Sequence, residues 1–183
     1  MNYVIVGNSF AGVFAAEAIR GRDPDGRIVL IGDEAERLYS RAMIHEYLAG
    51  MVDERKLYLR DEDFYDRLRI DLWAGRRAER LEAGDHVLIV GGERVGYDRL
   101  LLAVGGTPFI PPGIGNLDAF GSDIFTFTRL ADAVGLAEAA RRARQVVVLG
   151  AGLIGMQAAE ALAHLGKIVS VVEQADHILP LAV

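Results

Sequence analysis

Two glycine-rich turns in this 183-residue chain have the residue types and spacing to hold a phosphate group. The glycines are Gly7 and Gly12 in the first turn and Gly150, Gly152 and Gly155 in the second. Each turn follows an apolar run and precedes a helical pattern, which is how a βαβ unit holds the pyrophosphate of a dinucleotide. The free N–H groups and the dipole at the start of such a helix favour an anion. Two such turns predict two dinucleotides bound by one polypeptide, and therefore electron transfer between cofactors.

The two turns differ at their middle position. The second turn carries the complete Gly-x-Gly-x-x-Gly pattern, whereas the first has Ser9 where the middle glycine would stand. A serine hydroxyl can donate a hydrogen bond to a phosphate oxygen, so we keep Ser9 as a cofactor contact. The other contacts expected from the helix starts are Phe10 and Ala11 in the first turn and Leu153 and Ile154 in the second.

An acidic residue follows the next strand of each unit. Residues 28–31 lead to Asp33 and Glu34, and residues 168–172 lead to Glu173. A carboxylate at this position can accept hydrogen bonds from ribose hydroxyls. Glu173 would also repel a 2′-phosphate, so we predict NADH in preference to NADPH. The alternatives are a solvated acid at a strand end and a glycine turn in an α/β domain without nucleotide.

The periodicity of the chain predicts the elements that position these turns. We expect strands at 3–6 and 28–31, a helix at 10–20, and short helices at 40–49 and 61–67. Strands at 70–73, 76–82, 86–90, 93–97 and 99–103 would form a meander, with Gly91 and Gly92 as a hairpin turn. A helix at 129–143, a strand at 145–149, a helix at 153–165 and a strand ending at 173 would follow.

The predicted fold class is α/β, with two Rossmann-like dinucleotide-binding units that each contain a parallel sheet. The first unit carries the β-meander, and the second unit is incomplete. Residues 105–113 are rich in glycine and proline and cannot continue a helix or a central strand. We therefore expect a boundary here, with one domain at 1–112 and a second at 113–183.

Composition excludes several classes of function. The formal net charge is −6 and no basic cluster is present, so nucleic acid is not an expected partner. The sequence contains no cysteine, which excludes disulfides, thiolate metal sites, iron–sulfur ligation and a cysteine nucleophile. The histidines do not stand at metal-ligand spacing, and we expect no metal. Charges and glycines interrupt the most apolar stretch, 146–172, so we expect no membrane segment. The absence of cysteine fits a reducing compartment, and we expect a cytoplasmic protein.

The chain resembles the two-dinucleotide flavoproteins of the pyridine nucleotide-disulfide oxidoreductase superfamily. The nearest branch is the flavin part of NADH-dependent nitrite reductase large subunits and of rubredoxin and ferredoxin reductases. The motifs that carry the resemblance are Gly7-Asn8-Ser9-Phe10-Ala11-Gly12, Ile31-Gly32-Asp33-Glu34 with Leu38-Tyr39-Ser40-Arg41, Leu101-Leu102-Ala103-Val104-Gly105-Gly106-Thr107-Pro108, the second glycine turn, and Val172-Glu173 with the tail to Pro180.

The resemblance implies FAD on the first domain, with its adenosine ribose on Asp33, its pyrophosphate on the first turn and Arg41 along the cofactor. The backbone near Ala78 would meet the adenine, and Ala103, Val104 and Gly105 would close over the cofactor. NADH would lie on the second domain with its nicotinamide against the flavin. Hydride would pass from NADH to FAD, and electrons would then pass to a small-molecule or redox-protein acceptor. We also expect a homo-oligomer.

The chain departs from the family pattern at several positions. Ala42 stands where the thiol-using branches carry their redox cysteine, and Val104 replaces a threonine. Glu46 stands near a position where relatives have a lysine close to the flavin, and Gln157 replaces a glutamate of the second helix. We predict that Glu46 and Gln157 form a carboxylate–amide pair that takes the place of the ionic pair near the reacting rings.

These observations leave three hypotheses for function. The favoured one is an FAD-dependent NADH:acceptor oxidoreductase, of which this chain would be the N-terminal part. Under this hypothesis the resemblance implies the N-terminal part of an FAD-binding domain at 1–112 and the first half of an NADH-binding domain at 113–183. The second is a truncated, non-catalytic dinucleotide-binding module. The third, a thiol-dependent disulfide or peroxide reductase, would require a thiol from another chain. As a fragment, the chain should bind FAD weakly and self-associate through an uncovered apolar face.

Overall fold

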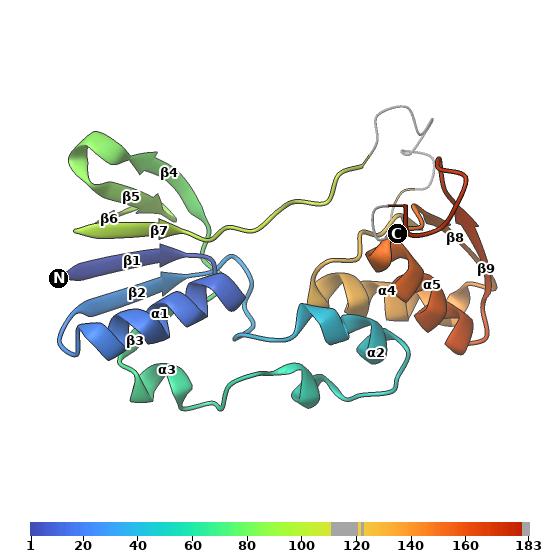
Figure 1. The fold of residues 1–183 in the computed structure, drawn as a ribbon, viewed down its shortest axis with the longest axis horizontal. Coiled ribbons are helices and arrows are strands. Elements are labelled where there is room, and N and C mark those ends of the chain that lie inside the picture. Colours follow the sequence, from blue (N-terminus) through green and yellow to red (C-terminus); the bar gives the residue numbers. More distant parts are fainter. Residues whose placement is uncertain (111–120, 122, 181–183) are drawn as a thin grey trace. The chain divides into compact units, whose positions relative to one another are not determined.

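The computed structural model describes residues 1–110, 121 and 123–180. The chain divides into two compact units (Figure 1). The first unit comprises Met1–Tyr39 and Tyr58–Gly106, and the second comprises Ser40–Leu57 and Thr107–Val183.

A parallel sheet of four strands forms the centre of the first unit. Its strand order is β3-β2-β1-β7, with β1 at Asn2–Val6, β2 at Arg27–Ile31, β3 at Ile70–Trp73 and β7 at Arg99–Leu102. Helix α1 (Phe10–Arg22) connects β1 to β2, and the short helix α3 (Phe64–Arg67) precedes β3. Because the strands are parallel, the first glycine turn, the acidic residues after β2 and the segment after β7 lie at one edge of this sheet.

Each face of this sheet carries a buried cluster, and the alternation of side chains assigns each residue to a face. Ile5, Ile28 and Leu30 pack with Val13 and Ala16 of α1 in one buried cluster. The intervening residues of β1 and β2 pack on the other side against a three-stranded antiparallel sheet. That second cluster contains Val4, Val6, Val29, Ile31, Leu88 and Val90.

The antiparallel sheet consists of β4 (Ala78–Glu82), β5 (Val87–Val90) and β6 (Glu93–Gly96), with the 3-10 helix Ala83–Asp85 between β4 and β5. Gly91 and Gly92 have φ angles of 57° and 79°, as a two-residue hairpin of this type requires, so the predicted turn is confirmed. The predicted meander of five strands is wrong in extent. β3 and β7 pair in parallel with β2 and β1 instead, because period-2 patterning reports a strand but not the direction of its partner.

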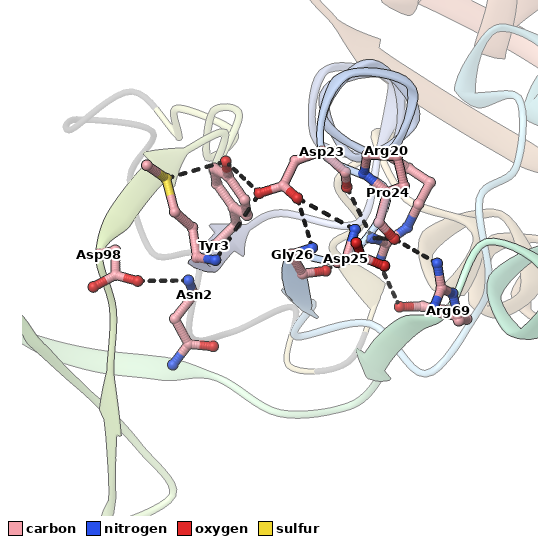
Figure 2. A network of polar contacts seen from close by, with 10 residues as sticks. Asn2, Tyr3, Arg20, Asp23, Pro24, Asp25, Gly26, Arg69 and Asp98 are labelled. Atoms are coloured by element: carbon pink, nitrogen blue, oxygen red, sulfur yellow. Dashed lines mark hydrogen bonds and ion pairs between the residues drawn. The ribbon is translucent and has the colours of Figure 1, made fainter.

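A polar network fixes the turn between α1 and β2 (Figure 2). The Arg20 guanidinium donates to five backbone carbonyls, those of Asp23, Pro24, Gly26, Leu68 and Arg69. The Tyr3 hydroxyl donates to Asp23 at 3.0 Å, and the Asp23 carboxylate also accepts from the Gly26 N–H. This network lies at the amino ends of β1 and β2, which is the end of the sheet opposite the glycine turn.

In its described residues the second unit contains a two-stranded parallel sheet and three α-helices. The strands are β8 (Gln145–Leu149) and β9 (Ile168–Val172), and the helices are α2 (Ile44–Leu48), α4 (Leu130–Arg142) and α5 (Leu153–His164). Two 3-10 helices, Arg41–Met43 and Glu54–Leu57, flank α2 in the chain. One face of the sheet packs on this helical layer through Val146, Val148 and Val169.

The other face of the β8–β9 sheet is exposed. Val147, Leu149, Ile168 and Val172 are 62%, 55%, 51% and 53% exposed. The parallel register pairs Val147 with Ser170 and Leu149 with Val172, so these side chains stand on the same face. The expectation of an apolar face without cover in the second unit is therefore met within the described residues.

Residues 40–57 pack with the second unit although they interrupt the first in sequence. Leu48 and Ala49 at the end of α2 are buried with Leu136 of α4 and Ala161 of α5. The predicted boundary between residues 112 and 113 falls in 111–120, outside the described residues, and stays a prediction. Among the residues described, none of the helices is long and apolar enough to cross a bilayer. The same residues contain no cluster of three potential metal ligands.

Candidate functional site: two dinucleotide-binding turns

The first glycine of the first turn occupies a position that no other residue would fill without strain. Gly7 has φ +120°, and a Cβ at Gly7 would lie 2.0 Å from the carbonyl oxygen of Ala103. The Gly7 N–H donates to the Ile31 oxygen at 2.7 Å, and the Ala103 N–H donates to the Val6 oxygen at 2.7 Å. The turn is thus fixed between the ends of β2 and β7.

The last glycine of this turn brings α1 close to the strand. A Cβ at Gly12 would lie 1.8 Å from the Gly7 carbonyl oxygen, so only glycine permits this approach. Ser9 is the N-cap residue of α1, and its carbonyl accepts the Val13 N–H at 3.0 Å. Phe10 and Ala11, in the first turn of the helix, are exposed. The predicted contacts of this turn therefore surround an accessible helix N-terminus.

The acidic residues of the first unit begin directly after β2. Asp33 is exposed, and Glu34 is half-buried and accepts a hydrogen bond from the Tyr39 hydroxyl at 2.5 Å. The Glu34 carbonyl accepts the Gly75 N–H at 2.8 Å. The segment is thereby held at the carboxyl edge of the sheet, where an adenosine ribose would lie if the glycine turn held the pyrophosphate.

Asn8 is a polar contact of the first turn whose role the sequence did not reveal. The buried Tyr65 donates its hydroxyl to Asn8 Oδ1 at 2.9 Å, and the Asn8 amide donates to the Glu36 carbonyl at 3.0 Å. The Leu38 N–H donates to the Tyr65 hydroxyl oxygen at 3.1 Å. Burial raises the pKa of Tyr65, so this side chain remains a neutral donor. The one available signal was a polar residue at the position that Ala151 occupies in the second turn.

The second turn repeats the backbone geometry of the first. Gly150 has φ +97°, and its N–H donates to the Val172 oxygen at 2.8 Å. A Cβ at Gly155 would lie 2.1 Å from the Gly150 carbonyl oxygen. At Gly152 a Cβ would meet no atom within 4 Å, so this position opens onto free space. Leu153 and Ile154 are exposed at 66% and 52% in the first turn of α5.

Glu173 joins the end of β9 to the second turn. Its carboxylate accepts the N–H groups of Ala151 at 2.7 Å, Gln174 at 2.7 Å and Ala175 at 3.0 Å. These backbone hydrogen bonds hold the pKa of Glu173 below its usual value, because they favour the charged form. The Ala151 carbonyl accepts the Leu179 N–H at 2.8 Å, so the tail also folds back to this turn.

The other predicted contacts are distributed over both units. Ala78 begins β4 and pairs with Val90, while Val104 and Gly105 are exposed after β7. Arg41 belongs to the second unit, where its guanidinium donates to the Thr128 carbonyl at 2.8 Å. A contact of Arg41 with FAD stays a prediction.

Glu46 and Gln157, the predicted catalytic pair, lie on two helices of the second unit. Both side chains are half-buried. Their helices, α2 and α5, pack through Leu48 and Leu162. In the described part of the chain no hydrogen bond joins Glu46 to Gln157, and the pairing stays a prediction.

The two units and their turns have the α/β fold of dinucleotide-binding proteins. The profile of the pyridine nucleotide-disulphide oxidoreductase family matches residues 1–182. The chain belongs to this family, which confirms the resemblance and the fold class inferred from the sequence.

Three relatives illustrate the match. The ferredoxin–NAD(+) reductase component of a 3-phenylpropionate/cinnamic acid dioxygenase from Photorhabdus laumondii is 35% identical over 97% of this chain and 44% of its own length. Nitrite reductase [NAD(P)H] from Bacillus subtilis is 32% identical over 96% of this chain and 22% of its own length. The crystal structure of a covalent putidaredoxin reductase–putidaredoxin complex matches with TM-score 0.89 and 28% identity, covering 100% of this chain and 44% of the matched chain. The chain thus spans less than half the length of these relatives.

Proposed function

We propose that this chain supplies the dinucleotide-binding units of an FAD-dependent NADH:acceptor oxidoreductase, with FAD on the first unit and NADH on the second. The observation that carries the proposal is the repeated turn. In both units the first glycine has a positive φ and donates to the last residue of the next strand, at 2.7 and 2.8 Å. In both units the last glycine lies where a Cβ would meet the carbonyl of the first.

The roles of the residues follow from their places at the two sheet edges. The turns from Gly7 to Gly12 and from Gly150 to Gly155 would hold the two pyrophosphates. Asp33 and Glu173 would accept from the adenosine riboses. When both cofactors are bound, their rings supply the transfer of a hydride from NADH to FAD, and the chain binds and orients them. Ala78, Ala103, Val104 and Gly105 would line the FAD site.

The acceptor that we propose is a small redox protein of the ferredoxin kind. This proposal is supported by the names of the relatives, which include ferredoxin–NAD(+) reductase components and a putidaredoxin reductase. A thiol-dependent reaction is not proposed, because the sequence contains no cysteine.

The experiment titrates the full-length protein that carries this chain with FAD and with FMN and then adds NADH without oxygen. We expect FAD to bind more tightly than FMN, because only FAD has the adenosine ribose that Asp33 would hold. Asp33→Asn should weaken FAD and leave FMN unchanged. NADH should then bleach the flavin, and ferredoxin should reoxidise it faster than small-molecule acceptors do.

The outcomes separate the hypotheses. Equal affinity for FAD and FMN would overturn the assignment of FAD. Tight binding of both dinucleotides without bleaching would identify a non-catalytic module. If neither dinucleotide binds, the turns have no nucleotide function in this chain.

A further inference from the structure

We infer that Asn8 and Tyr65 are positioning residues that couple the pyrophosphate turn of the first unit to the segment that carries Asp33. This inference rests on the proposed function, since the first unit must hold FAD for the coupling to matter. Asn8 lies in the turn that would hold the pyrophosphate. It follows Gly7 directly, between the strand end and the helix start that would hold the phosphates.

The Asn8 side chain points away from the helix start, toward the segment after β2. Its amide donates to the Glu36 carbonyl at 3.0 Å, and its Oδ1 accepts the Tyr65 hydroxyl at 2.9 Å. A Cβ at Gly32 would lie 2.7 Å from the Asn8 Cβ, so the absence of a side chain at Gly32, directly after β2, leaves room for the Asn8 side chain. Asn8 therefore contacts both ends of the segment that contains Asp33.

Tyr65 completes the link from a different element. It lies on α3, is only 6% exposed, and accepts the Leu38 N–H at 3.1 Å while it donates to Asn8. One buried hydroxyl is thus bonded on one side to the glycine turn and on the other to the segment after β2. A hydroxyl with both a donor and an acceptor partner has a fixed orientation, which makes the link specific.

In the second unit a different side chain links the glycine turn to the segment after the second strand. Ala151 occupies the position of Asn8 and has no side chain that could make this contact. There the Glu173 carboxylate itself accepts the Ala151 N–H at 2.7 Å. In each unit, then, the residue after the first glycine is hydrogen-bonded to the segment that follows the second strand. The first unit uses an amide and a phenol for this purpose, and the second uses the carboxylate.

The test combines a cofactor-free measurement with a ligand cycle, both in the full-length protein that carries this chain. Amide hydrogen exchange is measured at Leu38 in the wild type, Asn8→Ala and Tyr65→Phe. We expect faster exchange at Leu38 in both variants. Tyr3→Phe is the matched control, because it also removes one tyrosine hydroxyl from a bond in the first unit, at the opposite end of the sheet. It should leave Leu38 unchanged.

The ligand cycle compares FAD with an FAD analogue whose adenosine ribose lacks both hydroxyls. Asn8→Ala should weaken FAD on the order of tenfold, as loss of paired polar contacts predicts. Asn8→Ala should weaken binding of the analogue much less, because the misplaced Asp33 carboxylate would find no ribose hydroxyl on the analogue from which to accept a hydrogen bond. Tyr65→Phe should have the same pattern with a smaller effect.

Each outcome decides between the two claims. If a variant weakens FAD and the analogue by the same factor, or leaves Leu38 exchange unchanged, the positioning role is overturned and the proposed function stands. If the wild type binds no FAD, the proposed function fails and the positioning role fails with it.

Discussion

The glycine turns of the two units have the same backbone geometry, but the side chains and the sheets around these turns differ. In both turns the first glycine has a positive φ, and its N–H donates to the carbonyl of the last residue of the next strand. The last glycine of each turn lies against the carbonyl of the first. The first turn is braced by the side chain of Asn8, and the second by the carboxylate of Glu173. The glycines therefore fix the shape of the turn, whereas the side chain that holds the turn to the neighbouring segment can be an amide in one unit and a carboxylate in the other.

The sheets around the two turns differ as well. The four-stranded sheet of the first unit has buried clusters on both faces. The β8–β9 sheet of the second unit has a buried cluster on one face, and Val147 and Leu149 are more than half exposed on the other. Buried apolar area stabilises a fold roughly in proportion to its size, so we expect the first unit to be the more stable one.

The largest expected effect is a matched pair of glycine substitutions. Gly12→Ala and Gly155→Ala should each destabilise their own unit on the order of 3 kcal/mol, because the new Cβ meets a backbone carbonyl that cannot move freely. Hydrogen exchange resolved by residue would locate the loss in one unit at a time. Gly21→Ala, at a position of α1 with no atom within 4 Å of a Cβ, is the control and should stabilise slightly. A loss of stability of similar size in Gly21→Ala would contradict the steric explanation.

The exposed face of the second unit should control association. Val147→Lys with Leu149→Lys should reduce self-association of residues 1–183 at least about tenfold, since two charges interrupt the apolar face. Sedimentation velocity measures the change. Val134→Lys is the control, because Val134 is also exposed, at 45%, but lies on α4. Equal effects of the control and the double variant would show that the face is not the contact.

Glu173 should set the choice between NADH and NADPH. We expect kcat/KM, or binding affinity if turnover is absent, to favour NADH at least about tenfold, because the carboxylate would lie beside a 2′-phosphate of like charge. Glu173→Ala should bring the two cofactors close to equal. Asp176→Ala removes a neighbouring exposed carboxylate and serves as the control. A wild type without preference, unchanged in Glu173→Ala, would rule out this role.

The hydrogen bond from the Ala151 N–H to the Glu173 carboxylate, which holds the second turn, should depend on pH. The Tyr65–Asn8 hydrogen bond that holds the first turn should not change in the acid range. Backbone hydrogen bonds hold the pKa of Glu173 in the folded chain below its ordinary value. The stabilisation is therefore complete above that ordinary value and is lost as the pH falls through the lowered pKa of the folded chain. Exchange at the Ala151 amide should therefore increase in acid relative to Leu38. Glu173→Gln should remove most of that difference. An Ala151 amide that is equally protected across this range would contradict the assignment.

The smallest effect concerns Glu46 and Gln157. If they pair, a double-mutant cycle with Glu46→Ala and Gln157→Ala should give a coupling on the order of 0.5 kcal/mol in stability, because one neutral donor meets one carboxylate. Glu160→Ala, on the same helix α5 and exposed, replaces Gln157→Ala in the control cycle. Additive effects in the first cycle would eliminate the pair.

The sequence by itself determined the local elements and the positions of the two turns. The predicted strand at 70–73 and the helix from residue 10 agree with β3 and with the start of α1. The reason is physical: apolar periodicity, glycine and proline act within a few residues, and a Gly-x-x-x-x-Gly spacing requires the same close approach wherever it occurs. Asp33 and Glu173 could be located in the same way, at the ends of strands.

Only the tertiary structure decided what lies across long stretches of chain. The direction of β3 and β7, the packing of residues 40–57 with the second unit, and the bond between Tyr65 and Asn8 depend on partners far apart in sequence. Tyr65 and Asn8 are separated by 57 positions, and no local pattern relates them. A hydrogen bond between such residues depends on how the sheet and α3 pack, which periodicity does not encode.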